Sequence, residues 1–419
     1  MYARSYRVVR VSVGEELATG EADRVSSHVE EFAARTGEAE SGAVAANELA
    51  LLNRHRPLLR FDRQYDYRLA SVDGMVENAG NLLRTADGEV IARVGGDPAL
   101  TLELLTAYPD SREAKPDDCL CQAPDVLGDA RRMESEPRYA GRLYGRVVHD
   151  DGRDWLQYWF WLYYNPKNLF GFGKHEGDWE MIQIGLSSER RPEELAYAQH
   201  DTGEARKATE VEWIKRDGEQ HPVLYVAPLS HASYFEADTH PYPIGIDHPY
   251  GDGPEVWLPV ERFGDWVHWP GRWGNAERVI ATRIGNGPPS PSRQGSKWTS
   301  PAAFQRKMGR RKFRAVLGRL LYRLGKPFYP RPPELSARLE GRHCVVDYRL
   351  ENTTVRRSRH LYLTVHNGER VIASRAVRYG GDSGTEIFRL SQTPAALEVW
   401  GSTFNRVRQR SDLAEAAQQ

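Results

Sequence analysis

The run DWLQYWFWLYYN at residues 154–165 restricts the fold of this chain more than any other stretch. Large apolar side chains fill both sets of alternating positions, so a strand formed here must be covered on both of its faces. The turn sequence HDDG before it indicates a hairpin with the preceding segment RYAGRLYGRVV. From Leu58 to about Pro301, further short aromatic and β-branched runs alternate with Gly, Pro, Asp and Asn, as in all-β domains. We therefore predict a mainly β fold with a central antiparallel β-sandwich over 56–301, in which this strand is interior.

The two ends of the chain differ from this central region. Residues 1–55 show apolar spacings of three and four and are followed by Pro57, so we predict an N-terminal helical segment. Residues 335–407 contain alternating strand-like runs and an HNGE turn, which predict a C-terminal immunoglobulin-like β-sandwich. We expect the last residues, 408–419, to form a frayed tail.

Residues 302–334, between the two predicted sandwiches, combine a basic amphipathic helix at 302–324 with a proline-rich linker. The helix contains no acidic residue, so its arginines could make peripheral contact with a lipid membrane or an acidic partner. We favour the alternative, in which the helix packs on the central domain and leaves its arginines in water. The apolar side chains expected at that contact are Phe304, Met308, Phe313, Val316, Leu320 and Leu324.

Composition and charge argue against several classes of protein. The net charge of −1 and the pI near 6.9 give no reason to expect a nucleic-acid partner. No apolar run reaches the roughly 20 residues that a transmembrane helix needs, and the N-terminus lacks the apolar core of a signal peptide, so we expect a cytoplasmic protein. The three cysteines fit a reducing compartment. Cys119 and Cys121 form a C-x-C pair that could begin a soft-metal site, but without a second pair we interpret them as incidental thiols.

The segment HEGDWE at 175–180 places polar groups where a buried strand should begin. In a strand, Asp178 and Glu180 point to the same face, and the residues that alternate with them point into the core. Two carboxylates held side by side repel each other unless a positive group lies between them. A divalent cation could fill that role, with His175 folding back over the acids from a glycine-rich loop. Neutralisation by Lys174 or by an arginine is the alternative, and the pattern alone does not decide between the two.

Several histidines lie at the ends of predicted strands. Eight of the thirteen histidines fall between His149 and His268. His200 ends the run YAQH, and His231 follows the run HPVLYVAPLS. Imidazoles in such places are positioned to bind a ligand or to carry a proton. We therefore name His200 and His231 as candidate catalytic residues.

A series of motifs resembles the vacuolar protein sorting-associated protein 62 family. The resemblance covers roughly residues 45–300, with the motifs in the expected order, and it supplies no reaction. The motifs are LLNRHRPLLRFDRQYDYRLASVDGMVENA, LYGRVVHDDGRDWLQYWFWLYYNP, HEGDWE, YAQH, HPVLYVAPLSHASYF and WPGRWG.

The same HEGDWE motif is similar, more remotely, to the G-H-R-H-D-W-E signature of the Nep-like necrosis-inducing cytolysins. That resemblance implies a β-sandwich with a divalent cation in a surface cavity, bound by His175, Asp178 and Glu180. It also implies that His231 lies across the cavity as a further candidate ligand. Those proteins carry an aspartate in a Y-F-P-K-D stretch, where this chain has YYNPKN and ends in Asn168. An amide oxygen can still bind a hard cation, so Asn168 is another candidate ligand with one negative charge fewer.

These features together predict a divalent-cation-binding protein that binds an anionic or polyhydroxy ligand, such as a lipid headgroup or a glycan. The carboxylate-rich donor set favours Ca²⁺, Mg²⁺ or Mn²⁺ over Zn²⁺. One alternative is a metal-dependent hydrolase of a phosphoester or a glycan-linked bond, with His200 or His231 as general base or acid. Another is a scaffold whose site is vestigial. No nucleophile motif, phosphate loop or dinucleotide fingerprint is present, so the sequence does not decide whether the chain is an enzyme.

Overall fold

The structure is a computed structural model that describes residues 43–63, 69–111, 115–134, 136–165, 175–200, 202–242, 245–275, 287–309, 320, 324, 333–350, 360–368, 370–378, 382–402 and 408–412. The chain divides into two compact units, Met1–Ala50 and Leu51–Gln419. Among the described residues, a helix runs from residue 43 in the first unit to residue 54 in the second. Residues 1–42 of the predicted helical segment lie outside the described residues.

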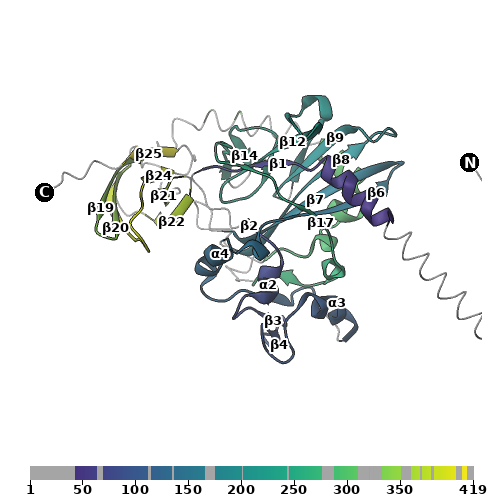
Figure 1. Cartoon of the computed structure of the whole chain (residues 1–419), viewed down its shortest axis with the longest axis horizontal. Coiled ribbons are helices and arrows are strands. Elements are labelled where there is room, and N and C mark those ends of the chain that lie inside the picture. Colours follow the sequence, from purple (N-terminus) through teal and green to yellow (C-terminus); the bar gives the residue numbers. More distant parts are fainter. Residues whose placement is uncertain are drawn as a thin grey trace, which may run out of the picture. The chain divides into compact units, whose positions relative to one another are not determined.

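A seven-stranded sheet is the largest sheet of the second unit (Figure 1). The predicted interior strand is confirmed, because β7 (Arg153–Asn165) pairs with β6 (Leu143–Asp150) on one side and β8 (His175–Leu186) on the other. Asp151 and Gly152 close the β6–β7 hairpin with φ angles of 55° and 76°, as a tight two-residue turn requires. The other strands of the sheet are β9 (Pro192–Gln199), β10 (Thr202–Lys207), β17 (Val260–Arg262) and the short β2 (Leu69–Ala70).

Alternate side chains of β7 enter two different cores. Leu156, Phe160 and Leu162 pack on one face against a second sheet, to which β1 and β12 contribute Leu59 and Leu224. This pair of sheets confirms the predicted sandwich. Its strands are mostly antiparallel, although β1 pairs with β12, and β17 with β6, in parallel. The second sheet contains β11 (Trp213–Arg216), β12 (Glu219–Val226), β1 (Leu58–Arg60), β16 (Glu255–Val256) and β13 (Ser233–Tyr234).

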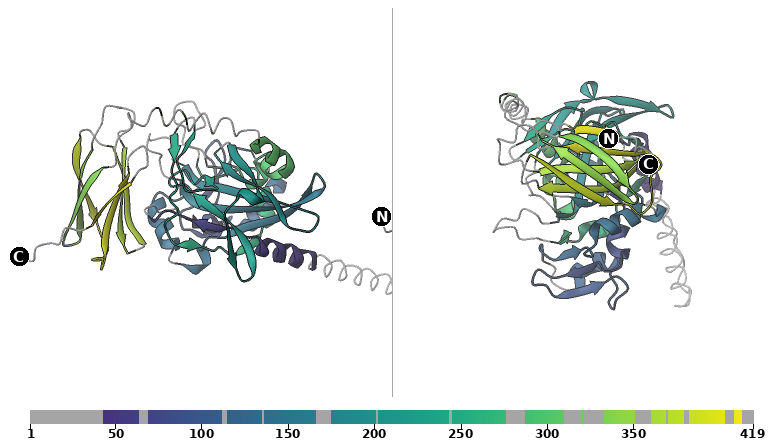
Figure 2. Two further views of the ribbon diagram at one scale, coloured as in Figure 1. Left: turned by 90° about the horizontal axis from the view of Figure 1, so that it is seen from above. Right: turned by 90° about the vertical axis from the view of Figure 1, so that its left-hand side faces the viewer.

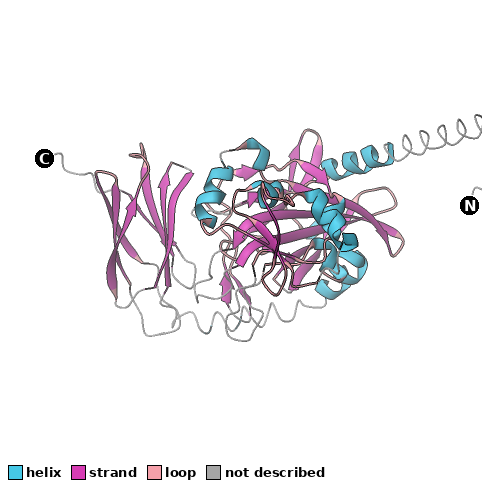
Figure 3. Ribbon diagram, turned by 90° about the horizontal axis from the view of Figure 1, so that it is seen from below, coloured by secondary structure: helices cyan, strands magenta, loops and turns pink. Residues whose placement is uncertain are grey.

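Residues 73–134, which we call the cap, cover part of the opposite face of β7 (Figure 1). Figure 3 shows the molecule from the cap side, with helices among the strands. The sequence pattern predicted only strands here, whereas the cap contains three helices. The cap comprises α2 (Asp73–Glu77), β3 (Leu82–Arg84), β4 (Val90–Arg93), α3 (Leu102–Ser111), β5 (Cys119–Cys121) and α4 (Val126–Glu134). Two of its helices, α3 and α4, bury the apolar side chains of one face, such as Leu105 and Tyr108 three residues apart on α3, in the core that also contains the tryptophans of β7.

Shorter elements complete the same unit. β18 pairs with β5 and extends the small sheet of the cap in the order β18-β5-β3-β4. β14 and β15 form a separate two-stranded sheet. The bounds of these elements are η1 (Pro137–Tyr139), η2 (Ala208–Glu210), β14 (His240–Tyr242), β15 (Gly245–Asp247), η3 (Asp265–His268), β18 (Arg272–Trp273), η4 (Pro291–Arg293) and α5 (Ser296–Thr299).

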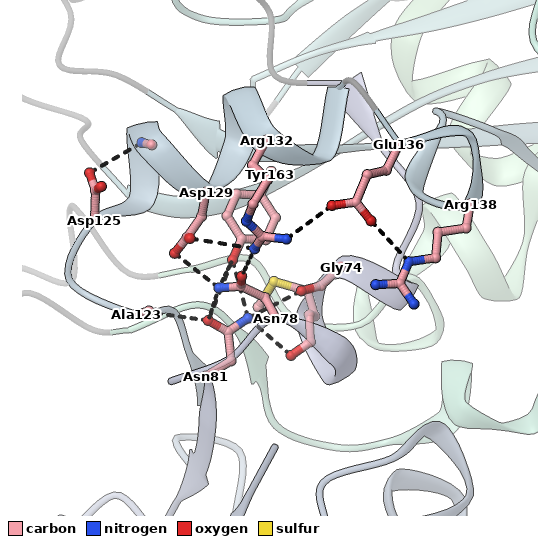
Figure 4. Close-up of polar contacts among 12 residues, drawn as sticks. Gly74, Asn78, Asn81, Ala123, Asp125, Asp129, Arg132, Glu136, Arg138 and Tyr163 are labelled. Carbon is pink, nitrogen blue, oxygen red and sulfur yellow. Dashed lines mark hydrogen bonds and ion pairs between the residues drawn. The ribbon is translucent and has the colours of Figure 1, made fainter. Parts of the chain in front are cut away.

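Buried amide side chains fasten the cap to β7 (Figure 4). Asn81 Nδ2 donates to the Tyr163 hydroxyl at 3.1 Å, and Asn81 Oδ1 accepts from the Ala123 backbone N–H at 2.8 Å. Asn78 Nδ2 donates to Asp129 Oδ2 on α4 at 3.0 Å. Both asparagines are 1% exposed, so losing a partner would leave a buried polar group unsatisfied. The polar contacts therefore fix how the cap lies on the sheet.

The predicted basic helix begins as α6 (Pro301–Gly309). Phe304 and Met308 are buried, as predicted, in the core that contains the cap residues and the tryptophans of β7. Leu320 and Leu324 are 53% and 65% exposed, so the prediction that they pack on the central domain is wrong. Phe313 and Val316 lie outside the described residues.

The C-terminal region forms a β-sandwich of its own, seen edge-on in Figure 2. Its two sheets have the strand orders β19-β20-β23 and β22-β21-β24-β25, as expected for an immunoglobulin-like sandwich. Asn367 and Gly368 lie in the predicted HNGE turn between β21 and β22. The strands are β19 (Glu334–Glu340), β20 (His343–Arg349), β21 (His360–Asn367), β22 (Arg370–Arg378), β23 (Ser383–Arg389), β24 (Leu397–Ser402) and β25 (Arg408–Asp412).

The strand β25 corrects the predicted tail at 408–419. It pairs with β24 along its whole length. Its sequence, RQRSD, is polar at every position, so it lacks the apolar alternation by which a strand is predicted. Residues 413–419 lie outside the described residues.

Candidate functional site

Asp178 and Glu180 lie on the face of β8 that is turned toward the second sheet. In the β7–β8 ladder they stand opposite Leu162 and Phe160, which belong to the core between the two sheets. The Glu180 residue is 6% exposed and the Asp178 side chain is 13% exposed. The two predicted carboxylates therefore share one face at the beginning of β8, at the border of an apolar core.

Gly177 brings His175 to the same place as Asp178. A regular strand would direct residues three apart to opposite faces. Gly177 has a φ of +66°, and a Cβ there would lie 2.0 Å from the Trp161 ring, so only glycine fits. At the end of the neighbouring strand β7, Asn165 Nδ2 lies 3.0 Å from His175 Nε2 and 3.3 Å from Asp178 Oδ2, so one amide contacts both residues.

The hydrogen bonds of His175 fix the roles of its two ring nitrogens. Nδ1 lies 2.6 Å from the Gly177 carbonyl, which can only accept, so Nδ1 carries the proton. Nε2 then accepts from Asn165 Nδ2, the same amide that donates to Asp178 Oδ2. This tautomer is the one that can bind a cation through Nε2.

His231 reaches Asp178 from the second sheet. It lies in the tight loop between β12 and β13, where Ala227 and Ala232 are hydrogen-bonded to each other. His231 has a φ of 56°, a left-handed conformation that is uncommon outside glycine. This conformation directs the ring inward, where Nδ1 donates to Asp178 Oδ2 at 3.0 Å and the side chain is only 1% exposed.

His200 belongs to a different pair. It follows β9 with a φ of 52°, and its Nε2 lies 2.9 Å from Asp247 Oδ2. The Tyr234 hydroxyl donates to the same oxygen at 2.7 Å. Asp247 is completely buried, whereas the His200 side chain is 30% exposed. Sequence analysis missed Asp247 and Tyr234, because nothing in the surrounding turn-rich sequence indicates that they meet His200.

The two acids of β8 have opposite electrostatic surroundings. Burial raises the pKa of Glu180 well above its usual value, and the negative charge of Asp178 raises it further. Burial also acts to raise the pKa of Asp178, but the hydrogen bond from His231 and the nearby imidazoles outweigh it and hold that pKa below its usual value. Asp178 is therefore ionised at neutral pH, and Glu180 binds its proton much more tightly than an ordinary glutamate.

Glu180 has no hydrogen bond or ion pair with any residue that the structure describes. Lys297 on α5 lowers its pKa through charge alone and does not neutralise it by contact. Lys174 and Asn168, which sequence analysis considered as a neutralising group and a ligand, lie outside the described residues. Within the described part of the chain, the site thus holds a buried carboxylate whose charged form has no partner.

The side chains are not arranged as a finished metal centre. Within the described ranges, no group of three or more His, Cys, Asp or Glu side chains is placed to hold a metal ion. Asp178 Oδ2 instead accepts hydrogen bonds from His231 and Asn165. Of the predicted site residues, His231 contacts this oxygen directly and His175 is linked to it through Asn165. Glu180 lies two residues further along the same face of β8. His200 pairs elsewhere.

Comparisons with known proteins give only distant matches. No protein-family model and no curated protein matches this chain. One similar solved structure, described as "Toxin fold as basis for microbial attack and plant defense", has 14% identity and a TM-score of 0.28 over 62% of this chain and 88% of its own. Necrosis and Ethylene inducing Protein 2, from the causal agent of cocoa's Witches Broom disease, has 13% identity and a TM-score of 0.27 over 59% and 87%. NLPPya in complex with glucosamine has 13% identity and a TM-score of 0.21 over 29% of this chain and 51% of its own, about half its length.

These neighbours are necrosis-inducing proteins, the group named by the more remote of the two sequence resemblances. TM-scores this low support no conclusion about the site or the function. The resemblance to the vacuolar protein sorting-associated protein 62 family has no support in these comparisons. Among the described residues, no helix has the length and apolar character to cross a membrane.

Proposed function

We propose that the chain is a divalent-cation-binding β-sandwich protein that binds an anionic or polyhydroxy ligand at the Asp178 site. The observation that carries the proposal is Glu180, a 6% exposed carboxylate that has no partner of its own among the described residues and lies one alternation from the ionised Asp178. A buried charge without a partner is costly, and a cation between the two acids would remove that cost.

The donor set suits a hard cation. Asp178 and Glu180 would supply carboxylate oxygens, and His175 would supply Nε2, which shares the Asn165 amide with Asp178. Asn165 and His231 would give up their hydrogen bonds to Asp178 Oδ2 and become the nearest further donors. Oxygen donors favour Ca²⁺, Mg²⁺ or Mn²⁺, and the absence of thiolate among these groups disfavours Zn²⁺.

The ligand class follows from the coordination positions of the cation that protein side chains do not fill. Ca²⁺ takes about six to eight oxygen ligands, more than these side chains supply. Asp178 and His175 are only partly buried, so a ligand oxygen could approach the cation from their side. Vicinal hydroxyls of a glycan or the oxygens of a lipid phosphate would complete the shell.

A second candidate function rests on the His200–Asp247 pair. A buried carboxylate that orients a partly exposed imidazole is the arrangement of a general base. The charge of His200 contributes to lowering the pKa of Asp178, so the two groups of residues interact. In this alternative His200 would accept a proton from water, a bound cation would supply the activation of that water, and the reaction would be hydrolysis of a phosphoester or a glycan-linked bond.

The test is thermal unfolding of the chelator-treated protein with added Ca²⁺, Mg²⁺, Mn²⁺ or Zn²⁺. A cation that binds only the folded state stabilises it by about 2.7 kcal/mol at a hundredfold excess over Kd. Asp178→Asn should abolish the shift, and Glu180→Gln, which keeps an oxygen donor, should reduce it. Asp217→Asn is the matched control, because it removes one carboxylate from an exposed turn and asparagine tolerates its φ of 52°.

Ligand-binding and hydrolysis assays distinguish the candidate functions. Inorganic phosphate and free mannose, as minimal anionic and polyhydroxy probes, should bind the cation-loaded protein and not the chelated protein. Cation-dependent hydrolysis of p-nitrophenyl phosphate that is lost in His200→Ala would favour the hydrolase. If none of the four cations changes the melting temperature of the natural chain or of any variant, the result would favour a scaffold with a vestigial site.

A further inference from the structure

The two cysteines of β5 touch each other inside the cap. Cys119 and Cys121 are two residues apart on one strand, so their side chains leave the same face. Their sulfurs lie 3.0 Å apart, and the residues are 3% and 6% exposed. Sequence analysis interpreted this C-x-C pair as incidental thiols, but the structure brings the two sulfurs into direct contact.

An arginine makes the two thiols unequal. Arg84 on β3 stands directly opposite Cys119 in the β3–β5 ladder, and its Nε donates to Cys119 Sγ at 3.4 Å. The hydrogen bond from Cys121 and then the guanidinium of Arg84 lower the pKa of Cys119 to about 7. The same hydrogen bond, together with burial, raises the pKa of Cys121. Cys119 is thus the nucleophilic thiolate, and Cys121 keeps its proton in contact with it.

The third cysteine provides an internal comparison. Cys344 lies in the C-terminal sandwich, is completely buried and has no cysteine neighbour among the described residues. Burial raises its pKa to about 11, so it holds almost no thiolate at neutral pH. A reagent that selects for thiolate should therefore distinguish Cys119 from Cys344.

We propose that Cys119 and Cys121 form a dithiol redox site that a hydroperoxide converts into a reversible disulfide. The Cys119 thiolate attacks the peroxide O–O bond, and with one proton this gives a sulfenic acid and water. The Cys121 sulfur then attacks the Cys119 sulfur, its own proton leaves with the hydroxide, and a second water is released. The net reaction takes two thiols and one hydrogen peroxide to one disulfide and two waters. A dithiol reductant reverses it by exchange.

The position of β5 connects this site to the Asp178 site. The backbone N–H of Gln122, next to Cys121, donates to Glu176 Oε2 at 2.8 Å. The Asn275 N–H donates to the same oxygen at 2.9 Å, and the Asn275 side chain accepts a hydrogen bond from Arg84. Glu176, which directly follows His175, is therefore held by two groups that adjoin the dithiol.

Oxidation should disturb this connection. Residues two apart on an extended strand have Cα atoms about 6.6 Å apart, near the upper limit for a disulfide, so β5 must shorten when the bond forms. The Cys119 thiolate also disappears as an acceptor for Arg84. We expect Glu176 to lose part of its anchoring, and with it the placement of His175. This consequence for cation affinity rests on the proposed function, whereas the thiol chemistry does not.

The first experiment treats the reduced full-length chain with equimolar hydrogen peroxide, alkylates the remaining thiols after denaturation, and maps the cysteines by mass spectrometry. The expected product has a Cys119–Cys121 disulfide, an alkylated Cys344, and full reversal by dithiothreitol. Alkylation of all three cysteines after peroxide treatment, or oxidation of Cys344 ahead of the pair, overturns the proposal.

Variants test the assigned roles. Cys121→Ala should stop at a sulfenic acid that dimedone traps on Cys119, and Cys344→Ala should oxidise like the natural chain. Arg84→Met should react about ten times more slowly, because it raises the pKa of Cys119. An unchanged rate in Arg84→Met, or dimedone labelling of Cys121 in Cys119→Ala at the natural rate, contradicts the assignment of Cys119 as the nucleophile.

Calcium affinity measured on the oxidised and the reduced chain tests the connection. A Kd that is at least severalfold weaker in the oxidised protein supports it, and identical Kd values refute the connection. If neither form binds a cation while the disulfide forms as described, the proposed function fails and the redox site stands.

Discussion

Two histidine–carboxylate pairs of the central sandwich, His231–Asp178 and His200–Asp247, are arranged in opposite ways. In the His231–Asp178 pair the imidazole is 1% exposed and the carboxylate is 13% exposed. In the His200–Asp247 pair the imidazole is 30% exposed and the carboxylate is completely buried. The member of each pair that solvent can reach is the one that can meet a ligand. The first pair therefore offers an anion to a cation, and the second offers a base to a proton.

Removing the buried acid should have the largest effect. Asp247→Ala leaves the Tyr234 hydroxyl and His200 without their shared acceptor, and breaking such a buried pair costs about 3–5 kcal/mol. Urea unfolding should show this loss at neutral pH. Asp178→Ala removes the more exposed acid and a source of repulsion for Glu180, so it should cost clearly less. Equal losses in the two variants would show that the difference in exposure between the pairs has no energetic meaning.

The pH dependence of cation binding should have the next largest effect. The pKa of Glu180 is raised in the folded protein, so its proton stabilises the apo form at low pH, and that stabilisation is lost as pH rises toward the raised pKa. A cation must displace the proton. Its affinity should therefore rise about tenfold per pH unit until Glu180 ionises. Titration calorimetry across pH measures this slope.

Glu180→Gln is the control for that slope. It removes the titrating proton and should flatten the pH dependence in the range above the usual glutamate pKa. The Asp178 pKa is lowered, so Asp178 stays ionised throughout that range. A slope that survives in Glu180→Gln would assign the proton to an imidazole and refute the role given to Glu180.

The smallest effect should come from Tyr234→Phe. This change removes the 2.7 Å hydrogen bond to Asp247 and keeps the ring stacked on His240, so it should cost about 1 kcal/mol. It should leave cation affinity unchanged, because the pair at Asp178 is not touched. A loss of cation affinity in Tyr234→Phe would show that the two pairs act as one site.

The sequence predicted the parts of this site that depend on local periodicity. β7 was predicted because both of its faces are apolar, and Asp178 and Glu180 were placed on one face because strand side chains alternate. The contact of His175 with Asn165 depends on a left-handed glycine, and the sequence shows a glycine but not its φ angle. Glu176 looked like a further acid of the motif, yet it is held by the Gln122 and Asn275 backbone N–H groups.

Long-range contacts explain what the sequence did not predict. Asp247 is separated from His200 by 47 positions, and no pattern within a single strand relates them. The helices α3 and α4 were missed because the aromatic and turn-rich texture of their surroundings was extended across them. The apolar spacing of these helices predicts a buried helix face only once it is known that the tryptophans of β7 belong to a core that residues of α3 and α4 share.

The asparagines that join the cap to β7 also determine how the protein opens. Asn78 and Asn81 are hydrogen-bonded at once to the Tyr163 hydroxyl of the sheet and to groups on α4 and on the chain before it. Separating the cap from the sheet would break all of these bonds in one step and expose a layer of indole rings. Local fraying is therefore an unfavourable route for this face. In native-state hydrogen exchange, amides of α4 and of the middle of β7 should exchange through a single cooperative opening with one shared free energy.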